Sequence, residues 1–299
     1  MYFLKNNEIT MSDQYKGLFS LHGGLLLFGG TAIFSRTLDL SALDITAWRC
    51  VVAAALLLGW LGLRKKTLVF NSTAHWLGLI ALSVLMGLHW VTYFHSMQVS
   101  SVTTGMLALF TYPVITVLLE PVLDHTRLQF RDLLAAILVV SGVVLMTPTL
   151  DPDNPVAAGV FWGIFSAALF SVRNILQRRY FSTYSPVLIM GWQTFFVAVM
   201  LLPFASHQLF SLPSEQWFQL LLLGTVFTAA PHTLLANSLR YLKATSVGLI
   251  SCLQPVYGTL LAAILLSEHP DFMTIAGGLL IIAAAANETL KKQPTQLKP

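Results

Sequence analysis

Long runs of apolar residues alternate with short polar connectors along almost the entire chain. Each run approaches the roughly 20 apolar residues that a helix needs to cross the hydrocarbon core of a bilayer. Glycine and proline within a run are compatible with this interpretation, because neighbouring helices can satisfy the backbone groups that they free. The pattern predicts ten membrane-spanning helices, at about residues 17–35, 44–63, 75–95, 100–119, 129–147, 157–176, 186–204, 216–239, 244–266 and 271–289.

Two separate segments of the chain recur at one offset. Residues 96–119 align with residues 238–261, an offset of 142 (238 − 96), and residues 17–35 align with residues 159–177 at the same offset. The matched pairs are Ser96/Ser238, Thr103/Thr245, Leu107/Leu249, Pro113/Pro255, Val114/Val256, Leu118/Leu260 and Leu119/Leu261, and Gly17/Gly159, Phe19/Phe161, Leu27/Leu169, Phe28/Phe170 and Ile33/Ile175. Because the offset is close to half the chain length, an internal duplication is predicted.

The duplication divides the chain into two halves and a linker. The first five-helix half covers residues 1–147, a linker rich in proline and aspartate covers 148–156, and the second five-helix half with a short tail covers 157–299. Since five is odd, the second half enters the membrane from the opposite side. We therefore predict an all-α membrane protein of ten transmembrane helices, built as two inverted five-helix repeats. This organisation is typical of transporters with a substrate site near the midplane.

The composition excludes an ordinary soluble protein. Charged residues are 10% of the chain, against about 25% in soluble domains. Hydrophobic residues are 56% and the mean hydropathy is +0.71. The net charge of +4 forms no basic face, so nucleic-acid binding is not expected. The two cysteines, Cys50 and Cys252, lie inside apolar runs, so we expect neither a disulfide nor a metal site, and no cofactor.

The placement of the basic residues predicts the orientation in the membrane. With the N-terminus in the cytoplasm, fourteen of the 17 lysine and arginine residues fall on the cytoplasmic side, and Arg36 alone falls outside. Cytoplasmic connectors carry such an excess of positive charge in membrane proteins. Both termini are therefore predicted to be cytoplasmic, with the 148–156 linker outside.

The chain resembles a known family. Its ten spans, its two five-span repeats, the proline in the fourth and ninth spans and the Trp48-Arg49 pair that opens the second span are similar to the EamA-type family of the drug/metabolite transporter superfamily. The resemblance covers about residues 17 to 290. It implies a multi-pass carrier of the bacterial inner membrane, usually an exporter of amino acids, other metabolites or toxic compounds. We expect a small-molecule substrate, contact with membrane lipid, and a monomer or weak homodimer.

Arg49 is the most costly residue of the chain, because it lies about one and a half turns inside the second span. One interpretation is an arginine that reaches toward lipid headgroups or pairs with Asp44. The other is an anion-binding group, for example for a substrate carboxylate. After a two-residue insertion its repeat counterpart is Gln193, which follows Trp192. A polar group in both halves favours a shared position on the substrate cavity.

Other candidates for the cavity are histidines and aromatic residues in the middle of spans. His89 and His232 are either core histidines bonded to a neighbouring helix, or groups that relay protons or contact substrate. Several aromatic side chains lie deeper than an interfacial belt or flank the repeated prolines, and Gln254 is the polar counterpart of one of them. These candidates are Tyr93, Tyr112, Trp162 and Tyr257.

Pro113 and Pro255 each remove a backbone hydrogen bond and are expected to kink their helices. The kinks are either static or act as paired hinges, and we favour the hinges. Gly159 and Gly163 allow close helix contact, which we expect to serve internal packing.

Two charged residues near the cytoplasmic ends of spans are expected to have simpler roles. Arg173 lies in the sixth span close to further arginines, where the excess of positive charge on the inner side explains it. Glu120 at the end of the fourth span is expected to be structural rather than a proton carrier, and Arg127 and Arg131 are its candidate partners.

The leading function is therefore a secondary carrier that works by alternating access. A membrane-embedded enzyme acting on lipid or isoprenoid is the first alternative, although the sequence lacks the paired carboxylates or histidines that such chemistry uses. A scaffold without transport is the second, and the loops are too short for the large extramembrane domain that it would need. The GxxxxGK[ST] motif of ATP-driven transport is absent from the sequence.

Overall fold

The computed structural model describes residues 11–70, 72–100, 102–123, 127–145, 156–206, 211–254, 256–257 and 272–290. Every regular element within these ranges is a helix, and none of the described residues forms a strand. The prediction of an all-helical fold is confirmed for this part of the chain.

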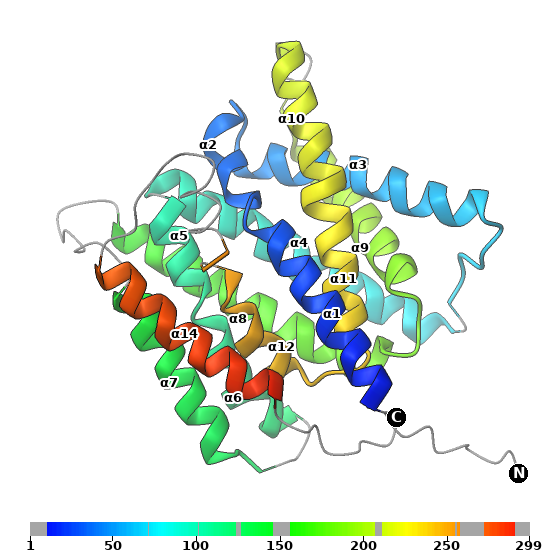
Figure 1. Ribbon diagram of the computed structural model, residues 1–299. Helices are drawn as coiled ribbons and strands as arrows, with labels where there is room; N and C mark the ends of the chain where they lie inside the picture. The colour runs from blue at the N-terminus through cyan, green and yellow to red at the C-terminus, as the bar shows by residue number, and fades with distance from the viewer. Residues whose placement is uncertain are drawn as a thin grey trace, which may run out of the picture.

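Most of the helices are long and follow one another with short connectors (Figure 1). They are α1 (Met11–Phe28), α2 (Phe34–Thr37), α3 (Ala42–Leu63), α4 (Thr73–Val99), α5 (Val102–Leu109), α6 (Tyr112–Leu123), α7 (Phe130–Leu145), α8 (Val156–Phe181), α9 (Pro186–Leu201), α10 (Ser214–Gly224), α11 (Ala230–Ser238), α12 (Ala244–Ser251) and α14 (Phe272–Leu290). The 3-10 turns η1 (Thr31–Ile33) and η2 (Leu202–Phe204) and the π-helical turn η4 (Thr225–Ala229) join some of them.

Six stretches of the described residues are long and apolar enough to cross a membrane, and they correspond to six of the predicted spans. They are Met11–Thr37, Ala42–Leu63, Thr73–Val99, Ala157–Phe181, Pro186–Phe204 and Ser214–Ser238. Large apolar side chains point outward, such as Phe19 and Leu63, which are 84% and 85% exposed, while Arg49 is fully buried. Apolar groups outside and polar groups inside suit a lipid environment.

The fourth predicted span is broken into two helices. Helix α5 ends at Leu109 and α6 begins at Tyr112, so Pro113 lies in the first turn of α6. The prediction of one helix kinked at Pro113 was therefore wrong. A proline in a continuous helix would clash with the carbonyl of Leu109, whereas the first turn of a new helix tolerates its missing N–H. The other predicted hinge, Pro255, lies outside the described residues.

Helix boundaries recur at the offset of the sequence repeat. Helix α12 begins and ends 142 residues after α5 (244 − 102 and 251 − 109), and α14 begins 142 residues after α7 (272 − 130). The chain therefore breaks its helices at corresponding places in the two halves.

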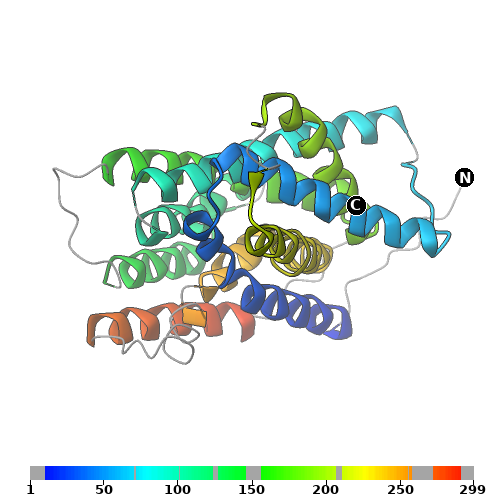
Figure 2. The same cartoon turned by 90° about the horizontal axis from the view of Figure 1, so that it is seen from above.

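The helices pack in pairs drawn from both halves. Helix α3 packs along α9, α7 along α14, α4 along α8, and α1 along α11. In the view from above, α1 (blue) and α14 (orange) lie along one edge of the bundle (Figure 2). The most extensively packed helix pairs thus join the two halves of the chain.

Gly159 and Gly163 on α8 mark a close contact with α4 and α5. A Cβ atom at Gly159 would collide with Ser100, and one at Gly163 with Ala108. Ser96 also donates a hydrogen bond to the carbonyl of Gly159 at 2.6 Å. These two glycines serve internal packing, as expected from their spacing.

Candidate substrate site

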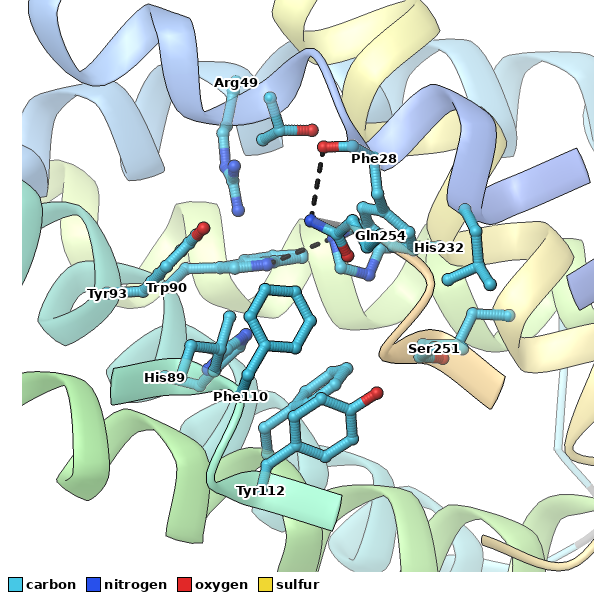
Figure 3. A pocket seen from close by; sticks show the side chains of 15 residues that line it. Phe28, Arg49, His89, Trp90, Tyr93, Phe110, Tyr112, His232, Ser251 and Gln254 are labelled. Carbon is cyan, nitrogen blue, oxygen red and sulfur yellow. Dashed lines mark hydrogen bonds between the residues drawn. The ribbon is translucent and has the colours of Figure 1, made fainter. Parts of the chain in front are cut away.

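A cavity lies where α1, α3, α4, α8 and α11 meet the broken ends of α5, α6 and α12 (Figure 3). Its lining residues are Leu25, Phe28, Thr31, Arg49, His89, Trp90, Tyr93, Leu109, Phe110, Tyr112, Phe170, His232, Leu235, Ser251 and Gln254. Six of the candidates named from the sequence are among them: Arg49, His89, Tyr93, Tyr112, His232 and Gln254. The wall is mostly aromatic and aliphatic, with a few polar groups, as in many small-molecule sites.

Arg49 points into this cavity from α3 (Figure 3). Its guanidinium carbon lies 4.3 Å from the centroid of the Trp90 ring and 4.9 Å from that of Phe94. Its Nε and Nη2 atoms are buried and have no hydrogen-bond partner among the described residues. A cation–π contact away from water contributes about 2 kcal/mol, while a buried unpaired charge costs several. The guanidinium therefore lacks the anion that would offset its burial.

Asp44 does not supply that anion. Its carboxylate accepts hydrogen bonds from the backbone N–H of Ser206 at 2.7 Å, from the Ser206 hydroxyl at 3.0 Å and from the Ser41 hydroxyl at 2.7 Å. Ion pairs within 4 Å among the described residues do not include Arg49. The interpretation of Arg49 as an arginine tied to Asp44 or reaching for headgroups was wrong.

His232 on α11 is bonded to Trp90 on α4. The Trp90 indole N–H donates to His232 Nε2 at 3.2 Å, and the ring of Phe28 meets the His232 ring edge-on at 4.6 Å. Because Nε2 accepts, a neutral imidazole carries its proton on Nδ1. Nδ1 is buried, and no described residue is its hydrogen-bond partner. His232 thus adds a second unpaired donor among the lining residues.

His89 is held by α8 in the manner of a core histidine. Its Nδ1 lies 2.7 Å from Ser166 Oγ and 3.2 Å from the Ser166 carbonyl oxygen. The Ser166 hydroxyl donates to the His89 carbonyl at 2.9 Å, so Nδ1 is the donor toward Ser166. The ring stacks on Phe170 at 4.5 Å and on Tyr93 at 6.1 Å. This arrangement leaves Nε2 as an acceptor on a ring that lines the cavity.

The helix breaks place Tyr112 and Gln254 at the cavity. The Tyr112 hydroxyl donates to the carbonyl of Gly248 at 3.2 Å, which joins the start of α6 to α12. The Gln254 amide donates to the carbonyl of Phe28 at 3.4 Å, as Figure 3 shows. Ser251 Oγ, at the end of α12, is buried and forms no hydrogen bond with the part of the chain that the structure describes.

Trp162 and Tyr257 lie outside the cavity lining. Trp162 is half-buried on α8 beside the exposed Phe161 and packs against His95 at 5.4 Å between ring centroids. The Tyr257 hydroxyl lies 3.1 Å from His22 Nδ1. Neither aromatic ring is among the residues that line the cavity.

Gln193 also lies outside the lining and meets Arg173. Its side-chain oxygen accepts from Arg173 Nε at 3.2 Å and Nη2 at 2.8 Å. Arg173 is fully buried, which the excess of positive charge expected on the inner side does not by itself account for. Helix α8 packs along α4, and Met190 and Gln193 of α9 contact the guanidinium, so the burial depends on contacts between helices that no single-helix pattern reveals.

Glu120 caps the start of α12. Its carboxylate accepts from the backbone N–H of Ala244 at 2.8 Å and of Thr245 at 2.7 Å, and lies 3.8 Å from Arg178 Nη1. The expected pairing with Arg127 or Arg131 was wrong, although a structural role fits. A negative charge is favourable at a helix N-terminus.

Several lining residues were not predicted from the sequence, although the repeat offset of 142 positions relates most of the lining residues to one another. Ten of the fifteen fall into five pairs separated by 142 positions: Phe28/Phe170, Trp90/His232, Tyr93/Leu235, Leu109/Ser251 and Tyr112/Gln254. Applying the offset to His232 would have found Trp90, and the repeated phenylalanine pair was itself a signal.

The apolar outer surface, the long helices and the polar groups around an enclosed cavity define a multi-pass membrane protein of the transporter class. The chain belongs to the EamA-like transporter family, whose sequence model matches residues 15–147 and 157–286. The resemblance found in the sequence is thereby confirmed.

Known proteins similar to this chain are named transporters. The uncharacterized transporter YxxF of Bacillus subtilis (strain 168) is 24% identical over 90% of this chain and 88% of its own length. An S-adenosylmethionine uptake transporter of Rickettsia felis is 24% identical over 64% of each chain. A crystal structure with a TM-score of 0.73 covers 93% of this chain and 96% of its own at 18% identity, which shows a shared fold.

Proposed function

We propose that the protein is a secondary active carrier that exports small metabolites, such as amino acids or related amphipathic and toxic compounds, by alternating access. The observation that carries the proposal is the buried guanidinium of Arg49, which lines the cavity with two unpaired nitrogen atoms. The names of the relatives favour a carrier over a lipid-modifying enzyme or a scaffold.

A carboxylate is the substrate group that suits Arg49 best. Its two oxygens match the geometry of a guanidinium, and a charge-assisted hydrogen bond contributes about 1.5–3 kcal/mol. The proton on His232 Nδ1 is a further donor for it. The aromatic wall, with Phe28, Phe110 and Phe170, provides apolar surface for the body of an amphipathic substrate. S-adenosylmethionine, for which the Rickettsia relative is named, also carries an amino-acid carboxylate.

The architecture that we propose is ten helices in two inverted five-helix repeats, with the cavity on the axis that relates them. The bond between Trp90 and His232 supports it, because these residues are 142 positions apart and only equivalent residues near a two-fold axis can touch. The packing of α3 with α9 and of α7 with α14 supports it in the same way. Inverted repeats carry their substrate site at such an axis. One chain encloses the cavity, so we propose the monomer as the transporting unit.

The proposed location is the inner membrane, with both termini in the cytoplasm. The basic connectors support this orientation, as does the acidic composition of the 148–156 linker. Uniport, exchange and proton coupling are all compatible with the arrangement of the site.

The experiment that identifies the substrate starts with a deletion strain and an overexpressing strain grown on toxic amino acids, their analogues and cationic dyes. Export predicts that overexpression protects against compounds with a free carboxylate, and that deletion sensitises to them. Everted vesicles then show the direction of flux, since one relative is named for uptake. Amides of the active compounds are the matched controls. Protection against dyes and amides, but not carboxylates, would contradict the role of Arg49.

A further inference from the structure

A second guanidinium is buried in the second half of the chain, on α8. Arg173 is fully buried, and its hydrogen-bond partners are neutral. Nε and Nη2 donate to the side-chain oxygen of Gln193 at 3.2 and 2.8 Å, and Nη1 donates to Asn174 Oδ1 at 2.9 Å. Nη2 also lies 3.1 Å from the sulfur of Met190. Among the described residues no carboxylate pairs with Arg173 within 4 Å.

The hydrogen-bond chain that starts at Arg173 ends in an unused donor. The Gln193 amide donates to Gln177 Oε1 at 2.9 Å, and Gln177 Nε2 is buried with no acceptor among the described residues. The cluster of Arg173, Asn174, Gln177 and Gln193 therefore carries a positive charge and more donors than acceptors. A buried cation needs an anionic partner to offset its desolvation, and this cluster lacks one.

The position of this cluster corresponds to that of Arg49 in the other half. Gln193 follows Trp192 as Arg49 follows Trp48, and α9 begins 144 residues after α3 (186 − 42). Arg173 is in turn 142 residues after Thr31, which lines the Arg49 cavity. Each half thus holds one buried guanidinium at the position of the tryptophan-flanked polar residue. In the first half it is Arg49 on α3, and in the second half it is Arg173 on α8.

We propose that Arg173, Gln193 and Gln177 form a second binding site for the substrate carboxylate, occupied when the carrier opens to the opposite side. This inference rests on the proposed carrier function. The carboxylate oxygens would replace the amide oxygens of Gln193 and Asn174 on the guanidinium, and the Gln177 N–H would gain an acceptor. A substrate anion that moves between Arg49 and Arg173 would then have a positively charged partner at both ends of its path.

The proposed topology places the two sites on opposite sides of the midplane. Arg49 is the eighth of 22 residues in α3, which runs inward, so it lies in the outer half of the membrane. Arg173 is the eighteenth of 26 residues in α8, which also runs inward, so it lies in the inner half. In this structure the second site is closed, since Arg173 is not part of the cavity lining.

Arginine labelling of the full chain in lipid nanodiscs tests the second site without a variant. Phenylglyoxal modification is followed at each arginine by peptide mass spectrometry, with 3-phenylpropanoate as the carboxylate and 3-phenylpropanamide as its neutral control. We expect Arg49 to react faster than Arg173, and the carboxylate alone to slow both reactions several-fold. Arg178, which lies beside Glu120, is the reference and should react at one rate throughout.

The outcomes separate this inference from the carrier proposal. Protection of Arg49 with an unreactive or unprotected Arg173 overturns the second site and leaves the first intact. Absence of protection at both arginines contradicts both.

Transport from each face gives an independent test. Arg173→Gln should raise the half-saturating concentration about tenfold on the cytoplasmic face alone, and Arg173→Lys should raise it less, because a lysine retains the charge without the planar fork. Size-exclusion chromatography establishes the amount of folded protein for each variant. An equal change on both faces would assign Arg173 to the scaffold and overturn the inference.

Discussion

Trp90 donates its indole N–H to His232 Nε2 at 3.2 Å, and the two residues are separated by 142 positions, the offset of the sequence repeat. The first copy of the repeat thus touches the second through equivalent residues. Both side chains line the cavity, and Arg49 lies over the Trp90 ring. The pair of residues related by the sequence repeat therefore lies in the cavity where we expect substrate to bind.

The Trp90–His232 bond should couple the two halves energetically. Trp90→Phe and His232→Phe should each lower stability, and the double variant should lose less than the sum, with a coupling of about 0.5–1.5 kcal/mol. Thermal unfolding in detergent measures it. Trp60→Phe is the control, because Trp60 is on the outer surface of α3. Strictly additive effects would mean that the bond does not link the halves.

Glu120→Gln should destabilise the protein, because a neutral amide is a weaker acceptor for the two backbone donors at the start of α12. The expected loss is about 1–3 kcal/mol, as for hydrogen bonds to a charged group. Glu215→Gln, at an exposed position in the first turn of α10, should change the unfolding temperature much less. Equal shifts for both variants would show that the Glu120 contacts contribute no more than a surface charge.

Reporter fusions test the proposed orientation. Fusions at Lys66, Asp153 and Lys292 should report cytoplasm, outside and cytoplasm, since the basic connectors lie inside. Alkaline phosphatase, which is active outside, and a fluorescent protein, which is active in the cytoplasm, give opposite signals at each point. A cytoplasmic signal at Asp153 would break the argument for inverted repeats.

The two repeated prolines should bias the carrier in opposite directions. Pro113 is the second residue of α6, directly after the break, and restoring an N–H there with alanine favours continuation of α5 into α6. Pro113→Ala and Pro255→Ala should therefore shift the balance between inward-open and outward-open states in opposite senses. Labelling of introduced cysteines from each side measures the balance. Wild-type accessibility and transport rate in both variants would show that the prolines are static.

The sequence predicted the long helices well, because their signal is the length of an apolar run. It could not distinguish a kink at Pro113 from a helix that starts there, since proline suits both. It was harder to predict which face of each helix packs against its neighbours. A membrane helix can be apolar on its lipid side and its packed side, so periodicity did not show that Trp162 on α8 lies outside the cavity lining. Polar residues at mid-span, such as Arg49 and His232, could be recognised because burying them is costly.

Burial of Arg173 could not be predicted, because it results from the packing of α8 against other helices. Charge near the end of a span has a simpler explanation in sequence terms, namely the excess of positive charge on the inner side. The positions of the aromatic residues Trp90 and Phe170 in the cavity lining could not be predicted either, because aromatic residues are common throughout the apolar runs. The repeat offset is the information that could have located them.

The most direct measurement of the central claim compares transport by the wild type and Arg49→Gln in proteoliposomes, using the carboxylate compound that the resistance panel selects. Glutamine is the residue of the repeat counterpart, Gln193, so it should be accepted at this depth. We expect transport to fall about tenfold or more, with an unchanged amount of folded protein, because the charged partner of the carboxylate is lost. Arg131→Gln, at an exposed position of α7, should transport normally. Wild-type transport by folded Arg49→Gln would contradict a carboxylate site at Arg49.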